Sequence, residues 1–438
     1  MSSDRPPDPQ SDSQPAPQVE PRLSPGPESR PAPVWVNLLL LLVVVVFCLG
    51  AAEGILRWAD LDYFKGSRAY HAELGWTAKP EQVLYLRRPE AGTVRYATNR
   101  KGFRDIEHRG ASIPVRRITV IGDSFTEAAE VDDVHTFTSR LKTRLNLARQ
   151  DKKQYWEVKR LGMGDFGSLQ ALLALRRYGL APKPEVVIFQ IFPYNDILNN
   201  SRSGAYWVSN QDAYRPYLDA DKNFQEITYL NPTVSWWRRH SHLARFSLLL
   251  AQQYVGPPAG ERLFKNNGPR LEWLQTQLPE LGMPADMDPT LLPMNTFSPP
   301  AQQMPAVAEG WQATLQTLRR VERLVHKRGA KLVVLVIPHG RQLSRVLHRR
   351  AVEMPFEIDP AYAEKELTAA LDGTPARVVP LLDQFEEHLD TVFPFVDGHL
   401  NIATHDLVAE RLFQELVDAG WADGPELEEI EPAPKTDP

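Results

Sequence analysis

Three short segments of the sequence carry side chains that could together perform acyl chemistry on a serine. A Gly-Asp-Ser sequence at residues 122–124 directly follows an apolar run, a position that holds a serine hydroxyl rigidly as a nucleophile. Asn195 follows a second apolar run, where its side-chain amide could donate a hydrogen bond to an oxyanion. Asp397 and His399 are two residues apart, so the carboxylate could orient the imidazole and leave its other nitrogen free as a base. Each segment taken alone is also an ordinary turn or helix cap.

Apolar runs predict the strands that must position these side chains. Residues 117–122, 186–192 and 331–337 are continuous and rich in β-branched side chains, and residues 377–380 form a shorter fourth candidate. Continuous apolar strands indicate a sheet that is buried on both faces. Ligands bind such parallel sheets at the carboxyl ends of the strands, which is where Ser124 and Asn195 stand.

Helical patterns separate these runs. Phe137, Leu141 and Leu145 recur every four residues, and Asp132 or Asp133 is predicted to cap this helix. Further helices are expected at residues 170–177, 307–325 and 404–419. Strands that alternate with helices predict an α/β fold with a central parallel sheet. Residues 200–305 interrupt the alternation and are interpreted as an insertion, a candidate cap over the site.

The ends of the chain differ from this central part. Residues 1–33 contain ten prolines and no aromatic side chain, which predicts a disordered tail. Residues 34–54 carry a long uncharged apolar run and predict one uncleaved transmembrane anchor, with a cleaved signal peptide as the main alternative. The domain from residue 70 to 424 is then expected on the periplasmic or extracellular side, and residues 425–438 form an acidic tail.

Composition excludes several classes of function. The net charge of −5 argues against a general nucleic-acid binder. Cys48 is the only cysteine, which rules out a disulfide framework and a cysteine-based zinc site. The glycines of residues 162–167 lack the context of a dinucleotide-binding loop. We therefore expect neither a cofactor nor a metal ion, and serine acyl chemistry requires neither.

The order of the three segments resembles that of the SGNH (GDSL-type) hydrolase superfamily. Residues 122–124 match its first block, residues 195–196 its third, and Asp397-x-His399 its last, in the spacing of membrane-associated polysaccharide O-acetyltransferase relatives. Residues 73–76 and 98–105 resemble a bacterial subgroup in which the domain follows a single membrane span. The resemblance covers roughly residues 70–420, with residues 200–305 poorly matched.

This resemblance implies a three-layer α/β/α, flavodoxin-like fold and a role for each residue. Ser124 would be the nucleophile, His399 the base and later the acid, and Asp397 the group that orients His399. The oxyanion would be held by the Ser124 N–H, the Asn195 side chain and a glycine N–H of the second block, which corresponds to residues 161–167. Asp165 occupies the usual position of that glycine, so the donor is expected at Gly164.

Three functions remain open from the sequence. The first is a serine esterase that removes O-acyl groups from an envelope carbohydrate or lipid. The second is an O-acyltransferase, in which a polysaccharide hydroxyl takes the acyl group in place of water. The third is a noncatalytic carbohydrate-binding scaffold, which the carboxylate of Asp165 and the long insertion would suit.

Overall fold

A computed structural model describes residues 33–59, 68–88, 91–108, 114–151, 153–208, 214–228, 237, 240–247, 268–343, 354–389 and 398–424. The chain divides into two units, residues 1–54 and residues 55–438. The described part of the first unit belongs almost entirely to helix α1 (Val34–Trp58), which continues into the second. The predicted tails lie outside the described residues, apart from Pro33.

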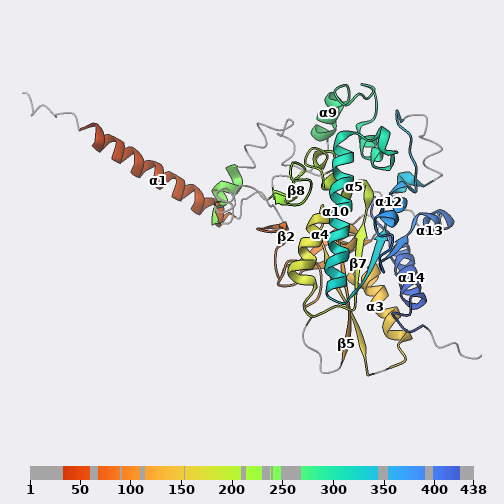
Figure 1. The fold of residues 1–438 in the computed structure, drawn as a ribbon. Coiled ribbons are helices and arrows are strands. Elements are labelled where there is room, and N and C mark those ends of the chain that lie inside the picture. The colour runs from red at the N-terminus through yellow and green to blue at the C-terminus, as the bar shows by residue number, and fades with distance from the viewer. Residues whose placement is uncertain are drawn as a thin grey trace, which may run out of the picture. The chain divides into compact units, whose positions relative to one another are not determined.

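A five-stranded parallel sheet forms the centre of the second unit (Figure 1). Its spatial order is β11-β10-β7-β5-β6, and every neighbouring pair is parallel. The chain enters at β5, moves outward to β6, and then crosses back to β7 on the other side. This is the flavodoxin-like order, which reverses between the first and third strands. The strands are β5 (Val115–Gly122), β6 (Tyr155–Gly162), β7 (Val186–Ile191), β10 (Lys331–Val336) and β11 (Arg377–Pro380).

Helices cover both faces of this sheet, so the predicted three-layer α/β/α fold is confirmed. Alternate residues of each strand point to opposite layers: Ile118 and Val120 belong to one hydrophobic cluster, and Ile121 to the other. The first cluster includes side chains of α3 (Phe137–Ala148), α13 (Leu382–Glu387) and α14 (Ile402–Asp418). The second includes side chains of α4 (Ser168–Ala174), η2 (Leu175–Gly179), α10 (Pro305–Lys327) and α12 (Tyr362–Ala370) (Figure 1).

Two details correct the expectations from the sequence. Strand β6 was not predicted, because it lies at the edge of the sheet and carries Glu157, Lys159 and Arg160 among its apolar residues. Helix α3 is capped by Thr136, whose hydroxyl accepts the Ser139 N–H at 3.3 Å. The predicted caps, Asp132 and Asp133, flank and begin the short helix η1 (Asp133–His135).

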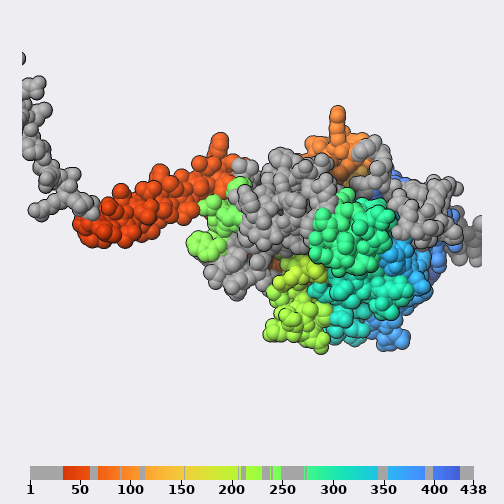
Figure 2. Space-filling model, turned by 90° about the horizontal axis from the view of Figure 1, so that it is seen from above, coloured from red at the N-terminus to blue at the C-terminus, as the bar shows by residue number. Residues whose placement is uncertain are grey.

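The remaining elements lie around the sheet. Part of the 200–305 region packs on the second layer, where η5 (Pro289–Phe297) contacts α5 (Pro193–Asn199) and α10. Figure 2 shows the green segment from α9 (Gly268–Gln277) to η6 (Pro300–Gln302) at the surface beside α10 in teal. Three hairpins are formed by β1 (Arg68–His71) with β2 (Gly75–Ala78), β3 (Val83–Arg88) with β4 (Gly92–Ala97), and β8 (Tyr217–Leu218) with β9 (Ile227–Thr228). The other helices are α2 (Ser124–Glu127), α6 (Ala205–Val208) and η7 (Gly340–Gln342).

Candidate active site

Ser124 and His399 meet at the carboxyl edge of the sheet. Ser124 is the first residue of α2, which begins two residues after β5 ends, and His399 lies in the loop that leads into α14. The Ser124 hydroxyl and His399 Nε2 are 2.9 Å apart, although 275 residues separate them along the chain. The pair lies next to the gap between β5 and β7, where the strand order reverses and where doubly wound sheets bind ligands.

The turn that presents Ser124 requires a glycine before it. A Cβ on Gly122 would lie 2.2 Å from Gln190 Oε1, so no other residue fits without moving buried groups. The same Gln190 oxygen accepts the Asp123 N–H at 3.1 Å. Asp123 then caps α2 by accepting the Phe125 N–H at 2.9 Å. These contacts fix the backbone on both sides of Ser124, while its side chain remains half-buried.

Asn195 reaches this turn from the end of β7. Its Nδ2 donates to Asp123 Oδ2 at 3.3 Å, so the amide lies beside the residue that precedes Ser124. Burial raises the pKa of Asp123 to about 6, against the hydrogen bonds from Phe125 and Asn195 and the attraction of His399. Asp196, which accepts the Phe192 N–H at 2.8 Å, has a pKa well above its ordinary value because of burial and the neighbouring Asp123.

Gly164 has a partner that the sequence did not indicate. Its N–H donates to Glu127 Oε2 at 2.7 Å, and the other oxygen of Glu127 accepts the Tyr96 hydroxyl at 2.5 Å. Burial and this carboxylate raise the pKa of Tyr96. The N–H expected to hold the oxyanion is therefore already used in this structure. Nothing in the sequence signals this contact, because Glu127 is a lone carboxylate within the short helix α2.

The Asp165 carboxylate is paired. Asp165 has a left-handed backbone conformation with φ of 62°, and its carboxylate accepts a hydrogen bond from Arg68 of β1 at 3.0 Å. Asp165 and Glu127 raise the pKa of Arg68 despite its burial. The ion pair neutralises the carboxylate that the sequence placed against the oxyanion.

Two other polar residues near the site, Arg104 and His405, have structural roles. Arg104 is 2% exposed and donates to the carbonyl oxygens of Ala128 and Val131, which holds the turn after α2. Its pKa is lowered to about 10 by burial and by the nearby charge of Arg160. His405 is fully buried; its Nδ1 accepts the Phe137 N–H, and its Nε2 lies 3.0 Å from Glu130. His405 therefore joins the start of α3 to the loop after α2 and has a structural role.

Asp397 lies outside the described residues, so its predicted contact with His399 stays a prediction. Besides its contact with Ser124, the His399 ring packs against Phe125, with the ring centroids 5.2 Å apart. Phe125 in turn lies 4.3 Å from Phe192 at the end of β7. The rings of His399, Phe125 and Phe192 are therefore in successive contact along the carboxyl edge of the sheet, from the loop before α14 to the end of β7.

His339 was not predicted as a site residue, although its position directly after a predicted strand indicates one. It follows β10 at the same edge of the sheet, as Ser124 follows β5. Its ring stacks on Tyr194, with centroids 3.9 Å apart and planes at 10°.

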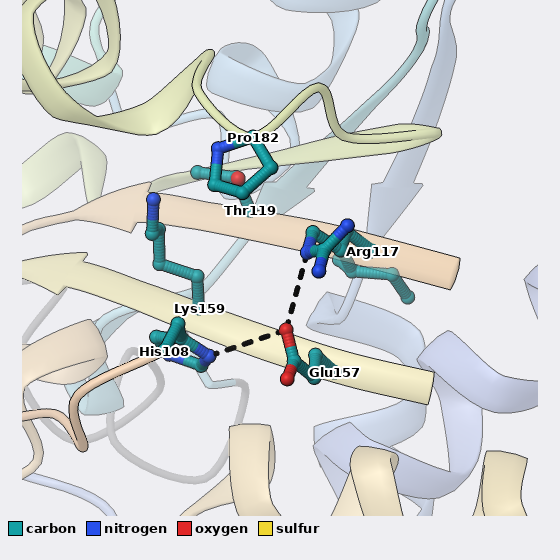
Figure 3. Close-up of a pocket in the computed structure, with 7 residues that line it drawn as sticks. His108, Arg117, Thr119, Glu157, Lys159 and Pro182 are labelled. Atoms are coloured by element: carbon teal, nitrogen blue, oxygen red, sulfur yellow. Dashed lines mark hydrogen bonds and ion pairs between the residues drawn. The ribbon is translucent and has the colours of Figure 1, made fainter. Parts of the chain in front are cut away.

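A second polar cluster lies along β5 and β6 (Figure 3). Glu157 accepts from Arg117 at 3.1 Å and lies 3.6 Å from His108. Lys159 donates to the carbonyl oxygens of Tyr178 and Ala181 at 2.9 and 3.0 Å, and burial lowers its pKa to about 8. The cavity beside them measures about 10 Å³, room for one water molecule, so this cluster holds the sheet edge and offers no substrate site.

Within the described ranges, no group of three or more His, Cys, Asp or Glu side chains is placed to hold a metal ion. Among the same residues, α1 is the one helix long and apolar enough to cross a membrane. Its 25 residues extend about 37 Å at 1.5 Å per residue.

No family model and no curated protein matches the chain. Solved structures similar to it include a lipase/acylhydrolase from Enterococcus faecalis, 14% identical, with a TM-score of 0.33 over 71% of this chain and 99% of that one. An acetylxylan esterase from Geobacillus stearothermophilus is 12% identical, with a TM-score of 0.34 over 71% and 99%. An α/β hydrolase from the metagenome of Lake Arreo, Spain, is 11% identical, with a TM-score of 0.34 over 72% and 97%. At these values the substrates of those enzymes are not transferred to this chain.

Proposed function

We propose that the chain is a membrane-anchored serine ester hydrolase that removes O-acyl groups from an envelope carbohydrate or lipid. The observation that carries the proposal is the 2.9 Å contact between the Ser124 hydroxyl and His399 Nε2 at the strand-order reversal. A serine and a histidine so far apart in the chain have no structural need to meet, and nucleophilic catalysis requires this contact.

The geometry supports a two-step reaction. His399 Nε2 takes the proton of Ser124 as its oxygen attacks the ester carbonyl, and then gives that proton to the departing alcohol. Water deprotonated by the same nitrogen attacks the acyl-enzyme, releases the carboxylic acid and restores the serine. Asp397, two residues from His399, is proposed to hold the imidazole in the orientation that this exchange needs.

The tetrahedral intermediate needs hydrogen-bond donors for its oxyanion. Asn195 uses one amide hydrogen on Asp123 and retains a second. The Ser124 N–H, at the start of α2, has no acceptor among the described residues. We propose these two groups as the principal donors; the Gly164 N–H joins them when Glu127 releases it. Each donor contributes about 100- to 1000-fold in rate.

The proposal is tested on the full chain in detergent with a fluorophosphonate probe and an acetyl ester such as p-nitrophenyl acetate. We expect one adduct on the wild type and none on Ser124→Ala. Turnover by Ser124→Ala and by His399→Ala should fall about 1000-fold or more. Ser139→Ala, the same change at a half-buried serine on α3, serves as the control.

Ester turnover that survives Ser124→Ala would contradict the mechanism. An adduct on the wild type with slow hydrolysis, and acetyl transfer to an added sugar, would instead indicate the O-acyltransferase. Absence of both adduct and turnover in a folded wild type would leave the noncatalytic scaffold.

A further inference from the structure

His339 and Tyr194 form a fixed ring pair at the carboxyl edge of the sheet. In the β10–β7 register Val336 lies opposite Ile191. His339 and Tyr194 each come three residues after these paired positions. Both are half-buried. The Thr290 carbonyl oxygen of η5 accepts the Tyr194 hydroxyl at 3.2 Å and also the Arg341 guanidinium at 2.5 Å. The 200–305 region therefore reaches the carboxyl edge at this pair.

The hydrogen bonds of His339 determine its tautomer. Its Nδ1 accepts the Arg341 N–H at 3.1 Å, so the ring hydrogen of the neutral imidazole must be on Nε2. Burial and the charge of Arg341 lower the pKa of His339 to about 3, which keeps the ring neutral. Among the described residues, no group accepts a hydrogen bond from Nε2. His339 therefore presents one oriented N–H donor over the pH range in which proteins work.

The sheet fixes the separation of this donor from the nucleophile. Ser124 follows β5, and His339 follows β10, two strands away, so they are about 10 Å apart at 4.7–4.9 Å per strand. That distance is too long for His339 to touch an acyl carbonyl at Ser124. The rings of Phe125 and Phe192 pack against each other between the two positions, and the centroids of the Phe192 and His339 rings are 5.8 Å apart.

We infer that Tyr194 and His339 form a subsite for the alcohol part of the ester, a carbohydrate ring, with the His339 Nε2–H donating to a sugar oxygen. This inference rests on the proposed function and adds the substrate class. The low exposure of Phe125 and Phe192, which lie between the subsite and Ser124, favours a sugar over an acyl chain as the bound part of the substrate. Phe125 and Phe192 are only 3% and 6% exposed, which leaves little apolar surface for a chain, whereas the far end offers an imidazole N–H.

The test compares two kinds of ester on the full chain in detergent. The probes are p-nitrophenyl acetate, which has no sugar, and mono-O-acetylated methyl glycosides of glucose, galactose, mannose and N-acetylglucosamine. His339→Phe keeps an aromatic ring on Tyr194 and removes the donor. We expect the ratio of kcat/KM on the best glycoside to that on p-nitrophenyl acetate to fall about 10-fold, the value of one hydrogen bond of about 1.4 kcal/mol. His339→Gln keeps an N–H donor and should lose less.

His326→Phe is the matched control, because His326 is an exposed histidine in the last turn of α10, at the opposite end of the sheet. It should leave the ratio unchanged. A ratio that His339→Phe leaves within twofold of the wild type, with an unchanged melting temperature, would overturn the inference. Turnover of p-nitrophenyl acetate but of none of the glycosides would also overturn it, while the esterase proposal would stand.

Binding provides a readout that does not need catalysis. Saturation-transfer NMR with the Ser124→Ala chain should detect the acetylated glycosides, and the added His339→Phe change should weaken their signal. If the wild type neither hydrolyses esters nor reacts with the fluorophosphonate, the proposed function fails, and this measurement still decides the subsite. Glycoside binding lost in His339→Phe supports it, and absence of binding, or binding unaffected by the variant, overturns it.

Discussion

Asp123, the residue before Ser124, lowers the stability of the folded state at neutral pH. Its side chain is 1% exposed, and burial raises its pKa to about 6, from about 3.9 in an unfolded chain. The folded state therefore holds its proton longer than the unfolded state does. The stability that protonation gives is fully present below about pH 4 and is lost as the pH rises to about 6.

Asp123→Asn should remove this cost while the side-chain oxygen still accepts the Phe125 N–H. We expect the variant to be more stable than the wild type by about 3 kcal/mol at pH 7, with the difference vanishing near pH 4. Urea unfolding at several pH values measures it, and the exposed Asp221→Asn controls for the change in net charge. A difference that stays constant with pH would show that burial does not perturb Asp123.

At the residue scale, the sequence located side chains better than it located their partners. Ser124, Asn195 and His399 were found because each stands after a strand or before a helix, a position that patterns reveal. The bond from Gly164 to Glu127 could not be found, because a backbone N–H takes whichever acceptor packing brings within reach. His339 was within reach of the same reasoning, since β10 was predicted and His339 follows it.

At the element scale, the predictable strands are those buried on both faces. Strands β5, β7 and β10 are apolar along their buried length, apart from Thr119 and Gln190, and were predicted. Strand β6 lies at the edge, where Glu157 pairs with Arg117 and Lys159 bonds to carbonyl oxygens, so charged residues break its pattern. The hairpins β1–β4 have short strands outside the sheet, and of these only β3, which reads Val-Leu-Tyr-Leu at residues 83–86, contains an apolar run. The charged residues of β6 account for the missed strand, because β11 lies at the opposite edge, carries the apolar Val378 and Val379, and was predicted.

The start of α3 offers a prediction at the same scale. Thr136 is fully buried; its hydroxyl accepts the Ser139 N–H and donates to the Asp133 carbonyl oxygen at 2.9 Å. Thr136→Ala should lower the free energy of unfolding by about 1–2 kcal/mol, and Thr136→Ser should restore most of it. Thr143→Ala removes a hydroxyl from the exposed face of the same helix and is the control. Equal losses from Thr136→Ala and Thr143→Ala in thermal unfolding would refute the cap.

At the scale of the whole molecule, the division of the chain at residue 54 separates an apolar helix from the unit that carries the site. None of the most apolar window of α1 is buried, and a helix of about 37 Å exceeds a hydrocarbon layer of about 30 Å. We propose that this much exposed apolar surface is covered by a lipid environment. The sheet, Ser124 and His399 all lie beyond residue 54, so folding of the site should not require that environment.

We therefore expect the full chain to sediment with membranes and to stay there through a high-salt wash. Deletion of residues 1–54 should release the protein into the aqueous fraction with ester turnover retained within about twofold. Deletion of residues 1–33 alone is the matched control, because it removes the proline-rich segment and keeps α1, and this variant should remain in the membrane fraction. The intact mass of the full-length product separates an anchor from a signal peptide: an anchor leaves residues 34–54 on the protein, whereas cleavage removes them. A soluble full-length chain, or a mass that lacks α1, would show that the helix does not anchor the protein.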